Sequence, residues 1–138
     1  MSEVVNPYLT ALNLGTGALR PFKSKVEVRL GDLREFFYDR DAVDKILSSS
    51  GNPVIYEYSE DSQPEVQGHL NFGVTVINPG KVRKEYYMTR GHYHASEKAA
   101  EIYVGLRGQG ILMMQSRGGQ LVHLPVRRGG VLYVPPSW

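Results

Sequence analysis

The feature that most constrains the fold is a succession of short segments with alternating polarity that fills the chain after residue 51. Apolar side chains occupy every second position from Leu70 to Val76, and a period of two places them on one face of a β-strand. Further segments of strand character, separated by glycine or proline, are residues 25–32, 52–60, 84–94, 100–108, 109–116, 121–130 and 131–138. Several short strands at about ten-residue spacing predict a β-sandwich or a small barrel.

One helical segment is expected near the N-terminus, over residues 32–51. Apolar residues recur there at helical spacing: Val43, Ile46 and Leu47. Asp32 is a candidate N-cap, and Asp39 or Asp41 could cap a second turn. Gly51 is suited to end the helix.

Composition excludes several classes of protein. A chain of 138 residues fits one domain, and the absence of cysteine removes disulfides and thiolate metal sites. The net charge of +2 comes from scattered basic residues, which argues against a nucleic-acid partner. The chain has no signal-peptide pattern and no apolar run of the roughly 20 residues that span a bilayer. We therefore expect a cytoplasmic protein with no membrane partner.

The stretch "TRGHYHASEKAAEIYVGLRGQG" carries the chemistry. If residues 84–94 form a strand, His92 and His94 share a face and can chelate one ion. On the next expected strand Glu101 and Tyr103 share a face, and apolar residues take the other. Imidazole and carboxylate ligands suit Fe(II), Mn, Ni, Co or Zn. The alternative interpretation is that these are only exposed or hydrogen-bonded histidines.

The same stretch resembles the first metal-binding motif of the cupins, in which two histidines and a glutamate bind a metal inside a double-stranded β-helix. Six residues separate His94 from Glu101, more than in the common cupin spacing. This longer gap is similar to that of the cupin-type phosphoglucose isomerases of archaea and some bacteria. The segments "PVIYEY", "LNFGVTVINPGKVRKEYYMTRGHYH" and "GGVLYVPPSW" extend the resemblance over roughly residues 26–138. It implies an all-β, jelly-roll-like cupin barrel, one domain over residues 1–138, with a short N-terminal helical segment.

The resemblance also implies an activity, a cofactor and a set of roles. The activity is the metal-dependent interconversion of glucose 6-phosphate and fructose 6-phosphate through a cis-enediol-like intermediate, a step of glycolysis and gluconeogenesis. His92, His94 and Glu101 match the metal ligands, and Glu101 also matches the carboxylate that moves the proton. One divalent ion is implied, Fe2+ first, with Mn2+, Ni2+ or Zn2+ as alternatives.

The implied substrate-binding residues match further positions of this sequence. Thr75, Thr89 and Gly91 correspond to positions that hold the sugar phosphate. Tyr56 and Tyr103 correspond to tyrosines that line the pocket. The partners implied are therefore a sugar phosphate and, because the family is commonly dimeric, a second copy of the chain.

The sequence departs from the family's pattern at its C-terminal end. The family's fourth metal ligand is a histidine two residues after the tryptophan that corresponds to Trp138, so we expect it beyond Trp138, together with further strands. Ser137 stands where the family often has an aromatic residue. We therefore expect the 138-residue chain alone to be a weak or inactive isomerase.

Two rival functions remain open. One is a different cupin enzyme, such as a dioxygenase or an isomerase of another sugar phosphate, that uses the same ligands. A dioxygenase would have no use for the threonines that the resemblance assigns to a phosphate. The other rival is a cupin that binds a metal or a sugar without catalysis.

Overall fold

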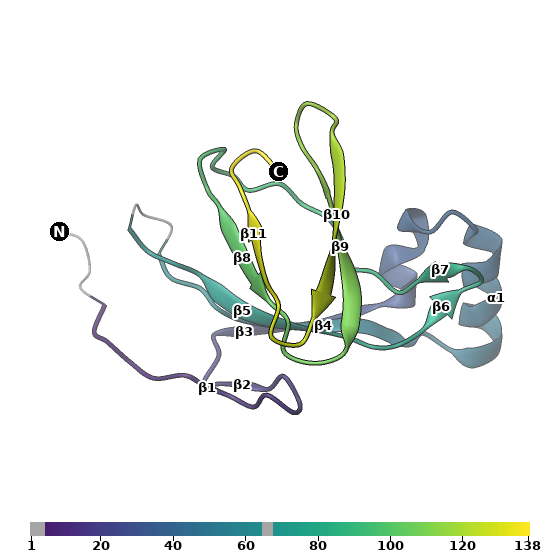
Figure 1. The fold of residues 1–138 in the computed structure, drawn as a ribbon. Coiled ribbons are helices and arrows are strands. Elements are labelled where there is room, and N and C mark those ends of the chain that lie inside the picture. The colour runs from purple at the N-terminus through teal and green to yellow at the C-terminus, as the bar shows by residue number, and fades with distance from the viewer. Residues whose placement is uncertain (1–4, 65–67) are drawn as a thin grey trace. The chain divides into compact units, whose positions relative to one another are not determined.

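The computed structural model describes residues 5–64 and 68–138. The chain divides into two compact units, and the boundary between them does not coincide with the gap in the described residues. The first unit runs to Arg90, and the second begins at Gly91. The described residues form small antiparallel sheets and two short helices (Figure 1). The expectation of a mostly β chain is confirmed. That residues 1–138 form a single domain stays a prediction. No helix in the described ranges is long and apolar enough to cross a membrane.

A three-stranded antiparallel sheet organises the first unit. Its strands, in spatial order, are β3 (Ser24–Arg29), β4 (Val54–Asp61) and β5 (Phe72–Ile77). Tyr58 pairs with Val26 on one side and with Thr75 on the other. Paired residues point to the same face, and alternate residues return to it. Tyr56 therefore shares a face of the sheet with Tyr58 and Thr75.

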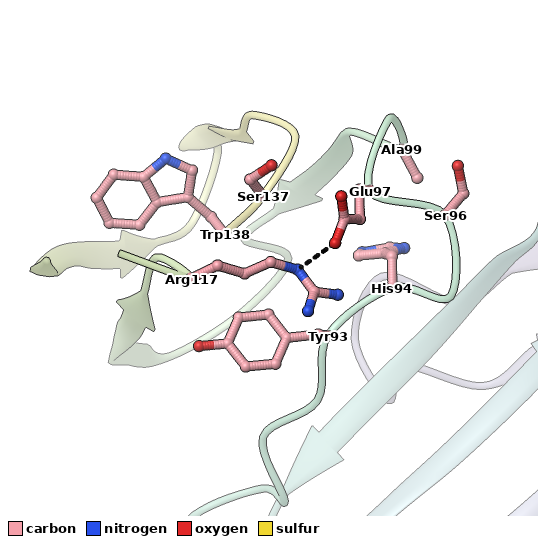
Figure 2. A pocket seen from close by; sticks show the side chains of 8 residues that line it. All are labelled: Tyr93, His94, Ser96, Glu97, Ala99, Arg117, Ser137 and Trp138. Carbon is pink, nitrogen blue, oxygen red and sulfur yellow. Dashed lines mark ion pairs between the residues drawn. The ribbon is translucent and has the colours of Figure 1, made fainter. Parts of the chain in front are cut away.

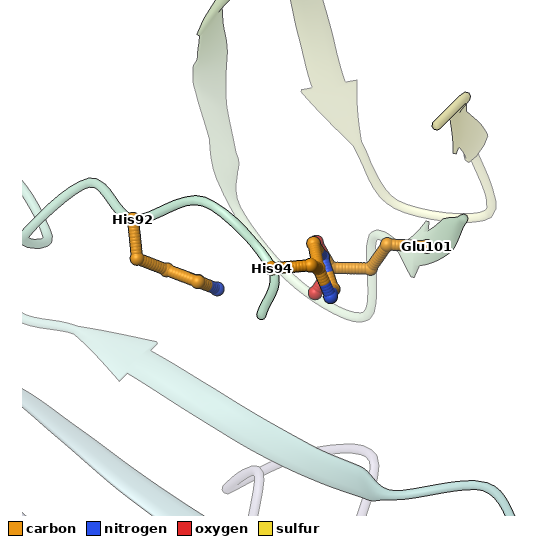
Figure 3. A group of neighbouring side chains, drawn as sticks. All are labelled: His92, His94 and Glu101. Carbon is orange, nitrogen blue, oxygen red and sulfur yellow. The ribbon is translucent and has the colours of Figure 1, made fainter. Parts of the chain in front are cut away.

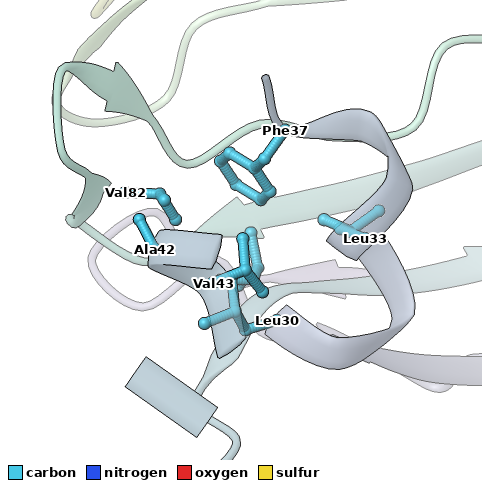
Figure 4. Packing of buried hydrophobic residues seen from close by; sticks show 7 residues of the cluster. Leu30, Leu33, Phe37, Ala42, Val43 and Val82 are labelled. Atoms are coloured by element: carbon cyan, nitrogen blue, oxygen red, sulfur yellow. The ribbon is translucent and has the colours of Figure 1, made fainter. Parts of the chain in front are cut away.

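The core of the first unit forms where two helices join this sheet. A 3₁₀ helix, η1 (Leu30–Phe36), is followed by α1 (Arg40–Ser50). The sequence predicted one helical segment over residues 32–51, but the backbone between the two helices is extended at Phe37. Seven residues make up the buried cluster (Figure 4): Leu30, Leu33, Phe37, Ala42, Val43, Ile55 and Val82.

The helix ends follow from local chemistry. The Asp39 carboxylate accepts a hydrogen bond from the Ala42 N–H at 2.9 Å, so Asp39 is the N-cap of α1. Gly51 ends α1 with a φ of 84°, a conformation that glycine adopts at little cost. The expectation that Asp32 is an N-cap is wrong. Its carboxylate instead reaches back to the Arg29 N–H at 2.8 Å from inside η1.

Two short hairpins complete the first unit. The N-terminal hairpin pairs β1 (Ala11–Leu12) with β2 (Leu19–Arg20), and the second pairs β6 (Lys81–Val82) with β7 (Glu85–Tyr86). The Glu85 carboxylate accepts hydrogen bonds from the Tyr38 N–H at 3.0 and 3.1 Å. This contact fixes the second hairpin beside the entry to α1.

The second unit is one long antiparallel ribbon with a bend. β8 (Glu101–Val104) pairs with β11 (Val131–Val134), and the inner strands β9 (Gln109–Gln115) and β10 (Leu121–Arg127) pair with each other. In chain order the β9–β10 hairpin is nested between β8 and β11, and the two pairs form separate ladders (Figure 1).

Gly105 forms the bend between the two ladders. Its N–H donates to the Gly130 carbonyl at 2.9 Å, and its carbonyl accepts from the Gly129 N–H at 2.7 Å. A Cβ at this position would collide with the Arg127 carbonyl. Only glycine therefore permits the close approach of the two chain segments at the bend.

The outer ladder has one buried and one exposed face. Glu101 and Tyr103 are half-buried, and the residues paired with them, Val134 and Leu132, are buried. The opposite face exposes apolar residues, namely Ile102, Val104, Val131 and Tyr133. The sequence-based prediction that Glu101 and Tyr103 share a face apart from Ile102 and Val104 is confirmed.

Candidate metal centre

The loop of residues 91–100 carries His92 and His94 and leads directly into β8. The sequence predicted a strand over residues 84–94. That prediction is wrong for residues 87–94, which lie outside every strand in the described part of the chain. The alternation of His92, Tyr93 and His94 is typical of a strand, but the segment pairs with no other strand in the described part of the chain. A shared strand face is therefore not what brings the two imidazoles together.

The three expected ligands nevertheless lie together (Figure 3). One donor atom from each of His92, His94 and Glu101 lies within 4.8 Å of the other two. Nε2 of His94 is 3.3 Å from Oε2 of Glu101, and the two imidazole rings have centroids 5.6 Å apart. His94 and Glu101 are half-buried, and His92 is exposed.

This donor set fits a divalent transition metal. Histidine nitrogens and carboxylate oxygens bind such ions at about 2.0–2.2 Å, so two ligands of one ion lie at most about 4.4 Å apart. The spread of 4.8 Å is only slightly wider, and small side-chain rotations would close it. Imidazole suits iron, nickel and zinc, and a carboxylate also suits manganese, so the set accepts any of these ions. Three protein ligands would also leave positions for water or substrate.

A small depression adjoins this cluster in the second unit (Figure 2). The residues that line it are Tyr93, His94, Ser96, Glu97, Ala99, Arg117, Ser137 and Trp138. The Arg117 guanidinium lies 4.9 Å from the centre of the Tyr93 ring and 3.4 Å from the Glu97 carboxylate. Sequence reasoning missed Arg117, because no spacing pattern connects the turn after β9 with the histidine loop.

The remaining expected site residues lie in both units. Tyr103 shares the buried side of β8 with Glu101, and Gly91 is the exposed residue just before the first histidine. In the first unit, Tyr56 and Thr75 share a face of the three-stranded sheet, and Thr89 is exposed after β7. Tyr56 also packs against the buried cluster of the first unit. That these five residues bind a substrate stays a prediction.

The fold and the cluster together define a small β-protein with a candidate two-histidine, one-carboxylate metal centre. Comparison with known proteins is more specific. Residues 28–138 match the family model described as glucose-6-phosphate isomerase. The chain is 40% identical over 136 residues to the glucose-6-phosphate isomerase of Thermococcus gammatolerans. The aligned region covers 99% of this chain and 70% of that protein.

Two further relatives agree with this match. The glucose-6-phosphate isomerase of Pyrococcus furiosus is 38% identical over 132 residues, or 96% of this chain and 69% of the relative. A putative glucose-6-phosphate isomerase of Rhizobium meliloti is 36% identical over 138 residues, or all of this chain and 64% of the relative. The chain therefore belongs to the glucose-6-phosphate isomerase family.

Proposed function

We propose that the chain is the part of a metal-dependent glucose-6-phosphate isomerase that holds its metal ligands and its catalytic carboxylate. The observation that carries this proposal is the cluster of His92, His94 and Glu101 in a chain of that family. The reaction interconverts an aldose phosphate and a ketose phosphate, so it must move one proton between C2 and C1 and another between the two oxygens.

Glu101 is the residue that we assign to the proton transfer between carbons. Its carboxylate would take the proton from C2 of glucose 6-phosphate, which gives a cis-enediol, and return it to C1 to form fructose 6-phosphate. A bound divalent ion would stabilise the negative charge that develops on the sugar oxygens. Glu101 can serve as both ligand and base only if one of its oxygens remains available to the substrate. Fe2+ is our first candidate for the ion, before Mn2+, Ni2+ and Zn2+.

The sugar phosphate would be held by Thr75, Thr89 and Gly91. Threonine hydroxyls and a backbone N–H beside glycine are donors suited to phosphate oxygens. Tyr56 and Tyr103 would line the pocket, where their rings restrict the sugar and their hydroxyls can donate to it. The shared sheet face of Tyr56 and Thr75 supports this assignment, as does the shared strand face of Tyr103 and Glu101.

We further propose a cupin barrel for the whole protein. The nested ribbon of the second unit supports it, because a double-stranded β-helix is wound from such a ribbon. A fourth ligand, a histidine beyond Trp138, would complete the metal site, and the relatives are longer than the matched region. A homodimer in the cytoplasm is our proposal for its assembly and location.

The test is isomerase activity on fructose 6-phosphate, measured by coupling to glucose-6-phosphate oxidation. The protein is stripped with EDTA and assayed again after addition of Fe(II), Mn(II), Ni(II) or Zn(II). We expect activity to vanish with the chelator and to return with metal. We expect Glu101→Gln to lower the rate of the metal-loaded protein by about 10²–10⁴-fold, the usual effect of a general base. His123→Gln is the matched control, since His123 is exposed on β10 and outside the cluster.

Two outcomes would favour the rival functions. A protein that binds one ion per chain without turnover would be a binding module, or would need the fourth ligand. Assay of a chain extended beyond Trp138 with the corresponding segment of a longer relative separates these explanations. Unchanged binding of fructose 6-phosphate in Thr75→Val and Thr89→Val would remove the argument for a phosphate site and favour a different cupin chemistry.

A further inference from the structure

The loop that carries the histidines has little support of its own. Residues 91–100 contain no strand or helix. The hydrogen bonds that the structure gives within the loop are from the Ala99 N–H to the Ser96 carbonyl at 3.1 Å and from the Lys98 N–H to the Ser96 hydroxyl at 3.4 Å. Both lie after His94. The order of the two histidines must therefore depend on contacts with another element.

Arg117 supplies such contacts from a rigid support. It lies in the turn between β9 and β10, where Ser116 and Gln120 exchange hydrogen bonds at 2.9 and 3.0 Å and the Gly119 N–H donates to the Ser116 carbonyl at 2.9 Å. The Arg117 N–H donates to the Ser137 carbonyl at 3.1 Å. The backbone at Arg117 is therefore held by hydrogen bonds that do not involve the loop of residues 91–100.

The two side chains that Arg117 contacts alternate in sequence with the three ligands. Tyr93, under the guanidinium at 4.9 Å, separates His92 from His94. Glu97, which pairs with the Arg117 Nε at 3.4 Å, lies between His94 and Glu101. Figure 2 shows the guanidinium between these two groups. Arg117 thus contacts the loop twice, once between the first and second ligands and once between the second and third.

We propose that Arg117 is a positioning residue of the metal centre, which clamps the loop of residues 91–100 so that its histidines stay close to Glu101. The inference rests on the proposed metal site, but its structural part applies to the metal-free protein as well. Arg117 is not itself a ligand, because a guanidinium is protonated and has no lone pair to offer.

The metal affinity of an Arg117 variant distinguishes a clamp from a simple electrostatic effect, because the two predict changes in opposite directions. A positive charge near a cation site disfavours the cation, and removal of Arg117 would then tighten metal binding. Loss of a clamp would weaken binding, because the ion would have to order the loop itself. A cation–π contact and an exposed ion pair are each modest. We therefore expect Arg117→Gln to raise the Kd for Mn2+ roughly tenfold, which corresponds to about 1.4 kcal/mol.

The experiment measures Mn2+ affinity by electron paramagnetic resonance, and hydrogen–deuterium exchange of residues 91–100 in the metal-free protein. We expect Arg117→Gln to weaken Mn2+ binding and to speed exchange in the loop. Tyr93→Leu should act in the same direction, and the double variant should be little worse than either single one. Arg117→Lys keeps the charge but loses the planar group that stacks on Tyr93, so it should fall between wild type and Arg117→Gln.

The control is Arg128→Gln, which removes the same charge from an exposed site outside the depression and should leave both readings unchanged. Equal or tighter Mn2+ binding by Arg117→Gln, with unchanged loop exchange, would overturn the clamp. If the wild type binds none of Mn2+, Fe2+, Ni2+ and Zn2+, the proposed function fails, while loop exchange in the metal-free variants still decides the role of Arg117. If Arg117→Gln does not fold, Tyr93→Leu and Arg117→Lys carry the same test.

Discussion

Nε2 of His94 lies 3.3 Å from Oε2 of Glu101, across the junction between the loop of residues 91–100 and β8. Each side chain is 30% exposed, so both reach solvent while the contact itself is partly shielded. Glu101 is anchored by its pairing with Val134 on β11, whereas His94 belongs to the irregular loop. The cluster therefore joins a fixed carboxylate to imidazoles whose placement depends on their surroundings.

Metal binding should stabilise the folded protein measurably. Only the folded chain brings the three ligands together, so an ion at 100 times its Kd should add about 2.7 kcal/mol to the free energy of unfolding. We expect Ni2+ or Mn2+ to raise the melting temperature of the wild type and to have little effect on His94→Gln. The same shift in His94→Gln and wild type would contradict the assigned ligand set. His123→Gln serves again as the control, because it should keep the full shift.

Gly105→Ala should destabilise the second unit. The added Cβ would meet the Arg127 carbonyl, so one of the two ladders must shift to make room, and overpacking of this kind costs about 1–3 kcal/mol. Urea unfolding measures the loss. Gly110→Ala is the matched control, because a Cβ at Gly110 has nothing within 4 Å. Equal stability of the two variants would mean that the bend at Gly105 tolerates a side chain.

Asp39→Ala should weaken α1. The substitution removes the acceptor of the Ala42 N–H and also the 2.7 Å ion pair with Arg83. Loss of an N-cap typically costs about 0.5–2 kcal/mol. Asp39→Asn keeps an oxygen acceptor at the cap and loses the charge, so its free energy of unfolding should lie closer to wild type. Thermal unfolding followed by circular dichroism compares the two, and a larger loss in Asp39→Asn would contradict the capping role.

The pair of Arg34 and Asp44 should contribute less stability in acid. Arg34 donates two hydrogen bonds to the Asp44 carboxylate, at 2.6 and 2.7 Å. These bonds lower the pKa of Asp44 below its ordinary value of 3.8. A lowered pKa in the folded state means that the pair stabilises the protein above about pH 4, and that this contribution disappears as the pH falls through the folded value.

A double-mutant cycle isolates that contribution. Arg34→Gln, Asp44→Asn and the double variant are unfolded with urea at about pH 7 and at about pH 2. We expect a coupling free energy between the two positions at the higher pH and a smaller one at the lower. A coupling that is independent of pH would show that the contact does not depend on the carboxylate charge.

The sequence predicted the β-rich fold and the three clustered residues, but not how the cluster is supported. Period-two alternation indicates a strand face, so β5 and β8 were accessible from residue order alone. The same signal failed at Tyr93 and its flanking histidines, because alternation does not reveal whether a neighbouring strand is available to pair. Arg117 was missed because its contacts join positions distant in sequence. Tyr56 and Thr75 became candidates only through family resemblance, since tyrosine and threonine are ordinary strand residues.

The nested ribbon also implies an order of events during folding. The short turn after Gln115 closes the smallest loop, so β9 and β10 can pair first at the lowest entropic cost. That pairing brings Gly105 and Gly130 together, and only then can β8 and β11 join without closing a long loop. Because Glu101 is the first residue of β8 and pairs with Val134, it would reach its final position near the end of this zipper. The three ligands of the candidate metal centre would thus come together late in folding, after the strands of the second unit have paired.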